Sequence, residues 1–222
     1  MSNSLSLTWS RWSGGYEIVD SLRPGMPVTW PEGGGHIGGP YLVPRGGEPF
    51  SYRPLENVLL VNEYAQIVHS AGASDKTRPS VILKLANKYG LLYGRADKLS
   101  AEPLSAWNHA DMALTILLGK WADGDGAAVP FVFNETEVAQ NTPRMDWEEG
   151  RERPVLLFEP KNLNDALKLQ VAELYSGGAE ARRCEYCSRP FVYGAGTPRR
   201  VGGEYCSPSC RRGAWRKRQG VA

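Results

Sequence analysis

The stretch that decides the fold of the C-terminal part reads CEYCSRPF (184–191), followed after a Gly- and Arg-rich segment by YCSPSCRR (205–212). The chain has four cysteines, and all of them lie here as two close pairs. A Cys-x-x-Cys turn directs two thiolates at one point, and a second pair can complete a tetrahedron around a metal ion. The spacing therefore predicts a single structural zinc ion per chain, held by Cys184, Cys187, Cys206 and Cys210.

Other uses of paired cysteines fit the sequence less well. A redox Cys-x-x-Cys pair normally follows a strand in a βαβ unit and would leave the second pair unexplained. Disulfides suit a secreted chain, but Met1–Trp9 lacks the basic and apolar parts of a secretory signal. No apolar run is long enough to span a membrane. We therefore expect a cytoplasmic protein with reduced thiols and no membrane association.

The residues around the second cysteine pair predict a short helix. Ser207 is a suitable N-cap, Pro208 suits the first helical position, and Gly220 can end the helix. Before it, glycines within Arg189–Tyr205 favour a hairpin. A cysteine turn, a hairpin and a helix that carries the last ligands form the plan of a treble-clef zinc finger.

These motifs resemble the CGNR-type zinc finger over about 35 residues, 184–218. The matching features are the Cys-x-x-Cys pair, Phe191, the pair Arg199-Arg200, the Tyr-Cys-Ser motif at 205–207, and a basic helix after Cys210. The family has Gly-Asn-Arg after its last cysteine, where this chain has Arg-Arg-Gly. In that family the finger is the C-terminal module of bacterial proteins with an N-terminal ABATE domain, so the resemblance implies a bacterial transcription regulator. Upstream of the finger, this chain shares with the family only the order of a helical region first and the finger last.

The charge of the chain is divided unevenly. Residues 182–218 carry ten Arg or Lys and two Glu, a charge of +8, whereas the rest of the chain carries −6. A basic module on an acidic body favours a polyanionic partner for the module. A few arginines would be enough to neutralise a zinc–thiolate cluster, and ten exceed that need.

The length suits one medium domain followed by a small module. We predict an α+β protein with a mainly helical N-terminal domain over residues 1–178 and a basic zinc finger over residues 179–222. Residues 1–54 are rich in Gly and Pro and predict an arm with short strands. The four predicted strands of this arm are Leu5–Trp9, Tyr16–Val19, Pro27–Trp30 and Tyr41–Val43.

Apolar periodicity predicts four helices in the remainder of the N-terminal domain. Their ranges are 54–70, 77–90, 102–121 and 162–176. Strands are predicted at Val129–Phe133 and Val155–Phe158, paired across a long polar loop. Gly177-Gly178-Ala179 is the predicted hinge to the finger, so truncation after Gly178 should leave a folded, helix-rich body.

The sequence contains no recognisable catalytic set. Its histidines, His36, His69 and His109, lack neighbouring groups that would make a nucleophile, a general base or a second metal site. We therefore expect a binding protein and not an enzyme. The ligand of the N-terminal domain is not indicated, and a homodimer through that domain is one expectation.

The leading functional hypothesis is a nucleic-acid-binding regulator whose partner is duplex DNA. On a helical wheel the small residues Gly213 and Ala214 fall on the zinc side, and the arginines fall on the outer face and its flanks. Trp215 has two alternatives, stacking on a base or filling the space between finger and body. The two competing classes are a protein-docking module and an enzyme acting on nucleic acid. The predicted nucleic-acid contacts are Arg199, Arg200, Arg211, Arg212, Trp215, Arg216 and Arg218.

Overall fold

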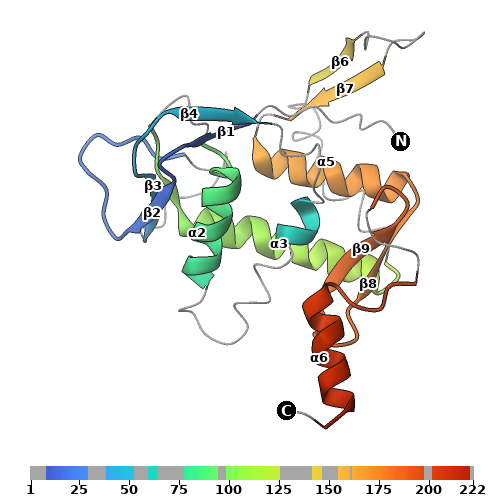
Figure 1. The fold of residues 1–222 in the computed structure, drawn as a ribbon. Coiled ribbons are helices and arrows are strands. Elements are labelled where there is room, and N and C mark those ends of the chain that lie inside the picture. Colours follow the sequence, from blue (N-terminus) through green and yellow to red (C-terminus); the bar gives the residue numbers. More distant parts are fainter. Residues whose placement is uncertain are drawn as a thin grey trace.

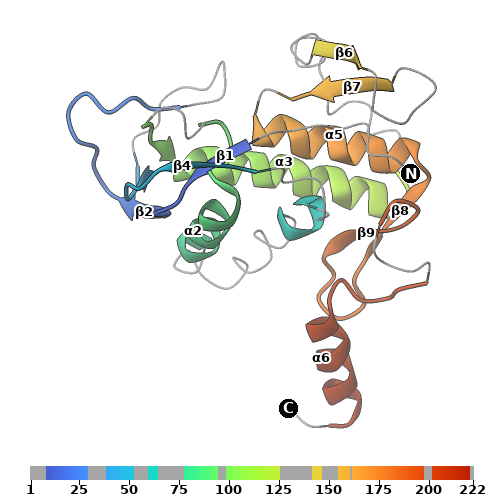
Figure 2. The same ribbon diagram turned by 45° about the horizontal axis from the view of Figure 1, so that its top comes forward.

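Two helices, α3 (Leu104–Ala122) and α5 (Leu163–Ser176), lie side by side at the centre of the molecule, with small antiparallel sheets around them (Figures 1 and 2). The computed structural model describes residues 9–29, 39–52, 60–64, 78–94, 99–125, 142–146, 155–160, 162–197 and 202–220. Helices and antiparallel strands occur together throughout these ranges, so the predicted α+β class is confirmed.

The strands in the described residues are short and pair antiparallel. The four sheets are β1 (Trp9–Trp12) with β4 (Pro49–Tyr52); β2 (Tyr16–Val19), β3 (Tyr41–Pro44) and β5 (Glu102–Pro103) in that order; β6 (Thr142–Asp146) with β7 (Val155–Glu159); and β8 (Ala179–Arg183) with β9 (Pro190–Gly194). The further helices are α2 (Arg78–Tyr89), α6 (Pro208–Arg218) and a helical segment at 60–64. Because the described residues before 178 contain seven strands as well as helices, this region is mixed and not simply helical.

The apolar stripes read from the sequence form the main core. Trp107, Leu114, Leu118 and Trp121 of α3 are buried, and so is the predicted face of α5, including the polar Gln170. Asn162 caps α5 as predicted, because its side-chain oxygen accepts the Asp165 backbone N–H at 2.8 Å. Within the described ranges, no helix has the length and apolar character needed to cross a membrane.

The N-terminal strands belong to this core, which corrects the prediction of an arm. Trp9 and Tyr16 are almost fully buried, and the Trp9 indole N–H donates to the Leu91 carbonyl at 3.1 Å. Gly90 makes the contact possible: it ends α2 with φ +84°, and a Cβ there would lie 2.8 Å from the Ser10 carbonyl oxygen. The burial of these large aromatic side chains contributes more free energy than the ordering of the neighbouring glycines costs. The segment therefore packs against the body and does not extend from it as an arm.

The other predicted strands of this region have mixed outcomes. The strands at Tyr16–Val19 and Tyr41–Val43 are confirmed. The first strand begins at Trp9, and the part of the prediction at residues 5–8 lies outside the described residues. The segment predicted at Pro27–Trp30 makes an isolated bridge from Val28 to Ala101 in its described part.

Strand β7 is present where it was predicted, and its described neighbour is a strand that the sequence did not predict. It pairs with β6, Thr142–Asp146, which lies inside the stretch assigned to a polar loop. The predicted partner, 129–133, falls outside the described residues. Eight residues connect β6 to β7, far fewer than would connect 129–133 to β7. A short loop costs less chain entropy to close than a long one.

Glu102 is a fully buried carboxylate two residues before α3. The helix was predicted to begin here, but it begins at Leu104, since Pro103 disfavours helical geometry in the residue before it. Glu102 instead joins β5, and its carboxylate accepts the backbone N–H groups of Leu92, Tyr93 and Gly94 at 2.9, 2.7 and 3.2 Å. Burial raises the pKa of Glu102 to about 7, and these N–H donors limit the rise.

This buried carboxylate predicts a stability that falls as pH rises. Between the ordinary glutamate pKa and about 7, the unfolded chain loses the Glu102 proton before the folded chain does. The parent should therefore lose stability from about pH 4.5 to about pH 7 by roughly 2–4 kcal/mol through this group. Urea unfolding of parent and Glu102→Gln across this range tests it. A stability difference between the two proteins that does not change with pH would contradict the prediction.

Candidate metal centre and basic helix

The first cysteine pair lies in the turn of the β8–β9 hairpin, which we call the knuckle (184–188). Cys184 N–H donates to the Arg189 carbonyl, and Ser188 N–H donates to the Cys184 carbonyl, both at 2.8 Å. Ser188 adopts φ +58°, a left-handed conformation that closes the turn so that the chain can return along β9. The hairpin predicted after Arg189 is different here: β9 pairs with β8 before the knuckle, and the described residues 202–205 contain no strand.

The second pair is carried by the start of α6, as predicted. Cys206 precedes the helix and Cys210 lies in its first turn. The Ser207 hydroxyl accepts the Cys210 backbone N–H at 3.1 Å, and Pro208 occupies the first turn, where its missing N–H leaves no donor in need of an acceptor. The N-cap thereby fixes the position of the last cysteine relative to the knuckle.

Backbone and side-chain contacts hold the two cysteine pairs together. Glu185 N–H donates to the Glu204 carbonyl at 3.1 Å, which joins the knuckle to the segment before Cys206. Arg182 on β8 donates to the Gly203 carbonyl at 3.2 Å, and its guanidinium stacks over the Tyr193 ring. Because the metal-binding segments are joined by these contacts, the four sulfurs converge in the folded chain.

The four sulfur atoms all lie within 4.8 Å of one another and can hold a metal ion. The distances are 3.6 Å for Cys187–Cys206, 3.4 Å for Cys206–Cys210 and 3.7 Å for Cys187–Cys210. A tetrahedron with metal–sulfur bonds of about 2.3 Å has edges of about 3.8 Å, close to these values. Disulfide sulfurs lie about 2.0 Å apart, so the cysteines are free thiols that share a metal-sized site.

The thiols do not ionise alike. Burial opposes ionisation of Cys184, but backbone N–H groups of Cys206, Cys187 and Tyr186 outweigh it and lower the pKa to about 7. Burial is also the largest influence on Cys187 and Cys206, and it raises the pKa of both. A bound cation would offset that cost and favour four thiolates.

The strands that lead to the knuckle belong to the main core of the body. Ala179 on β8 and Val192 on β9 are buried among the residues of that core, and both strands pack against α3. The buried Asn62 amide donates to the Val192 carbonyl at 3.3 Å and accepts the Val192 N–H at 3.1 Å. Ala179 is therefore a core residue, although the sequence favoured a hinge there.

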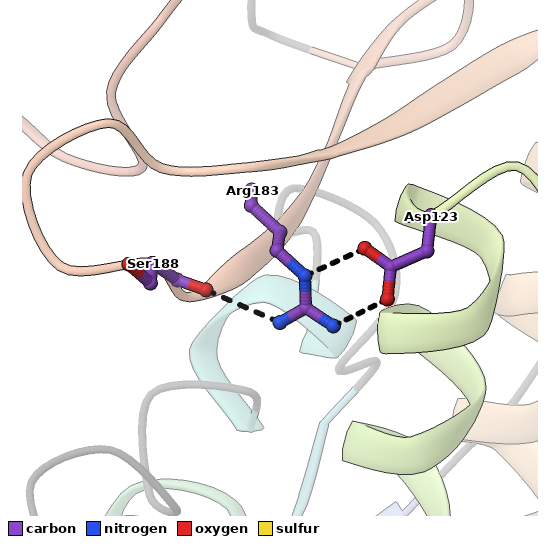
Figure 3. Close-up of polar contacts among 3 residues, drawn as sticks. All are labelled: Asp123, Arg183 and Ser188. Carbon is purple, nitrogen blue, oxygen red and sulfur yellow. Dashed lines mark hydrogen bonds and ion pairs between the residues drawn. The ribbon is translucent and has the colours of Figure 1, made fainter.

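An exposed ion pair adds a second connection near the knuckle (Figure 3). Arg183 donates from Nε and one terminal nitrogen to the two Asp123 carboxylate oxygens, at 2.7 and 2.6 Å. Its other terminal nitrogen donates to the Ser188 carbonyl at 3.4 Å. The Asp123 contact raises the pKa of Arg183, and the Arg183 contact lowers the pKa of Asp123. Since both side chains are about half exposed, the pair orients the knuckle more than it stabilises the fold.

Helix α6 extends away from the body and ends at the C-terminal tip of the molecule (Figures 1 and 2). It contains no buried residue, five basic residues and no acidic one. Arg211, Arg212, Arg216 and Arg218 are exposed, as is Trp215. Arg199 and Arg200 lie outside the described residues, so their contact with nucleic acid stays a prediction. His109 is exposed on α3, whereas His36 and His69 also lie outside the described ranges.

A close contact orients α6 against the knuckle on the side that the helical wheel predicted, and its partner is Tyr186. The Tyr186 ring lies over Gly213, where a Cβ would come 2.6 Å from a ring carbon. Gly213 therefore faces the metal-binding side, in agreement with the helical wheel, and leaves the opposite side of the helix open. The absence of a side chain at Gly213 was a signal for a close approach, but the sequence did not identify the partner.

Comparison with known proteins adds no relative. No protein-family model matches the chain, and no curated protein or solved structure matches it. What the site can do therefore rests on its own geometry.

Proposed function

We propose that this chain is a zinc-finger protein that binds duplex DNA through α6 and acts as a transcription regulator in the cytoplasm. The observation that carries the proposal is α6 itself, a helix with no buried residue, five basic residues and no acidic one, whose first turn carries the last cysteine of a four-cysteine metal site. Such a helix presents positive charge to phosphates, and its diameter suits the major groove.

Zinc is the metal that this donor set favours. Four thiolates are soft ligands, the sulfur distances approach a tetrahedral arrangement, and no ligand position is left for water or substrate. The proposed role of the zinc is structural, and the module is a treble-clef-like finger of the CGNR type, with the knuckle in one hairpin and the last ligands on the helix. Zinc would hold α6 at a defined angle to the body.

Docking of the finger on an acidic surface is the competing function. One version, docking on this chain's own body, gains no support from the contacts: within the described residues no ion pair joins α6 to a carboxylate of the body. An acidic partner protein would be distinguished by saturable binding that duplex DNA does not displace.

Two further alternatives have their own signatures. An enzyme acting on nucleic acid would be revealed by turnover of its substrate. A homodimer through the N-terminal domain would add a second copy of α6 to the complex.

The salt dependence of DNA binding tests the proposal. Arg212→Ala and Arg216→Ala should weaken binding to a duplex, and each should lower the slope of log K against log salt by about one if the lost contact is with phosphate. The matched control is Arg23→Ala, an exposed arginine of the body. Zinc content is measured for every variant before titration. Zinc-loaded variants that bind like the parent, with the same slope, would contradict the role of α6.

A further inference from the structure

Trp215 is the large apolar side chain that remains exposed on the basic helix. Its exposed fraction is 58%, the highest among the exposed large hydrophobic residues described. In the described part of the chain its indole makes no hydrogen bond, ring contact or cation–π contact, and α6 has no buried residue. The sequence allowed Trp215 to fill the space between finger and body, but in the described structure more than half of its side chain is exposed to solvent.

The surroundings of Trp215 are cationic. On the helix, Arg211 lies four residues before it, and Arg212 and Arg218 lie three residues before and after it, so all three are its surface neighbours. Gly213, which packs under Tyr186, lies toward the opposite side of the helix. The open face of α6 therefore presents one flat aromatic ring surrounded by guanidinium groups.

This arrangement restricts the partner. A helix that lies on a lipid surface needs an apolar stripe of several residues, and α6 offers Trp215 and the small Ala214. A partner that offered only phosphate groups would bind the arginines and leave the indole in water. A nucleic acid supplies both chemistries, but paired bases in a duplex show their edges in the grooves and keep their faces stacked.

We propose that Trp215 stacks on the face of an unpaired base while the surrounding arginines bind its flanking phosphates. This inference rests on the proposed nucleic-acid function and specifies its target: a single strand, or a duplex with an unpaired base. Base–aromatic stacking tolerates any base, because each base has a π face. The arginines hold the backbone, and the indole selects for an accessible base.

The test compares three DNA probes with the full-length, zinc-loaded protein. They are a perfect duplex, the same duplex with one unpaired 2-aminopurine, and the corresponding single strand. The parent should bind the unpaired-base duplex about 5- to 150-fold more tightly than the perfect duplex and quench the 2-aminopurine fluorescence. The affinity for the single strand shows whether the site accepts any unpaired base or needs a duplex beside the unpaired base.

Variants assign the preference to the indole. Trp215→Ala should remove the preference and the quenching, Trp215→Phe should keep part of both, and Arg212→Ala should weaken binding to all probes by a similar factor. Zinc content and the thermal transition verify that each variant is folded. Equal parent affinity for the three probes, or a preference that survives in Trp215→Ala, would overturn the stacking role and leave the proposed function standing. Failure of the parent to bind any probe would overturn both.

Discussion

A chain that ends after Gly178 should lose its cooperative unfolding transition. It lacks β8 and β9, and with them the buried Ala179 and Val192 and both hydrogen bonds to the Asn62 amide. Loss of the valine burial and two unpaired polar groups in the core together cost about 4–8 kcal/mol. Since a domain is stable by about 5–15 kcal/mol, this loss removes a large part of the stability and, at the low end of that range, all of it. Differential scanning calorimetry measures the transition.

The matched control is a chain that ends after Thr197. It keeps both strands and the Arg183–Asp123 pair but lacks Cys206, Cys210 and α6. This chain should unfold cooperatively near the temperature of the full-length body. If the chain ending at Gly178 is as stable as the chain ending at Thr197, the hairpin is not part of the body and the boundary predicted from the sequence holds.

Replacing Cys206 by Ser should abolish stoichiometric metal binding. The Cys206 sulfur lies near two other cysteine sulfurs, and its side chain is buried in the small cluster with Phe191 and Tyr193. Zinc binding contributes about 10–16 kcal/mol in small finger peptides, so most of the ordering of α6 depends on it. Changing a residue that only hydrogen-bonds to a metal ligand weakens metal binding about 10- to 100-fold. Loss of a ligand itself should weaken zinc binding by more than that.

Three measurements define the expected result for Cys206→Ser. Elemental analysis should give zinc in the parent and essentially none in the variant, DNA binding should be lost, and the thermal transition of the body should remain. Ser209→Ala, a change at an exposed residue between two ligands, serves as the control and should keep zinc. A variant that still binds zinc at full stoichiometry, or a parent purified without zinc, would contradict the four-cysteine site.

The sequence alone determined the features that depend on local chemistry. The cysteine spacing predicted the metal-binding cluster, Ser207 and Asn162 predicted two helix starts, and the apolar stripes predicted the faces of α3 and α5. Each depends on residues a few positions apart, because a cap, a Cys-x-x-Cys turn and a helical face are short-range properties. The basic character of α6 is likewise a matter of composition.

Tertiary structure alone decided how these parts are joined. Asn62 and Val192 are separated by 130 residues, and only the folded chain shows that a core amide binds the β8–β9 hairpin. The partners of Arg183 and Gly213, the pairing of β7 and the burial of Trp9 likewise depend on distant segments. Which surfaces meet is set by packing of the whole chain, and a residue's neighbours in sequence carry little information about it.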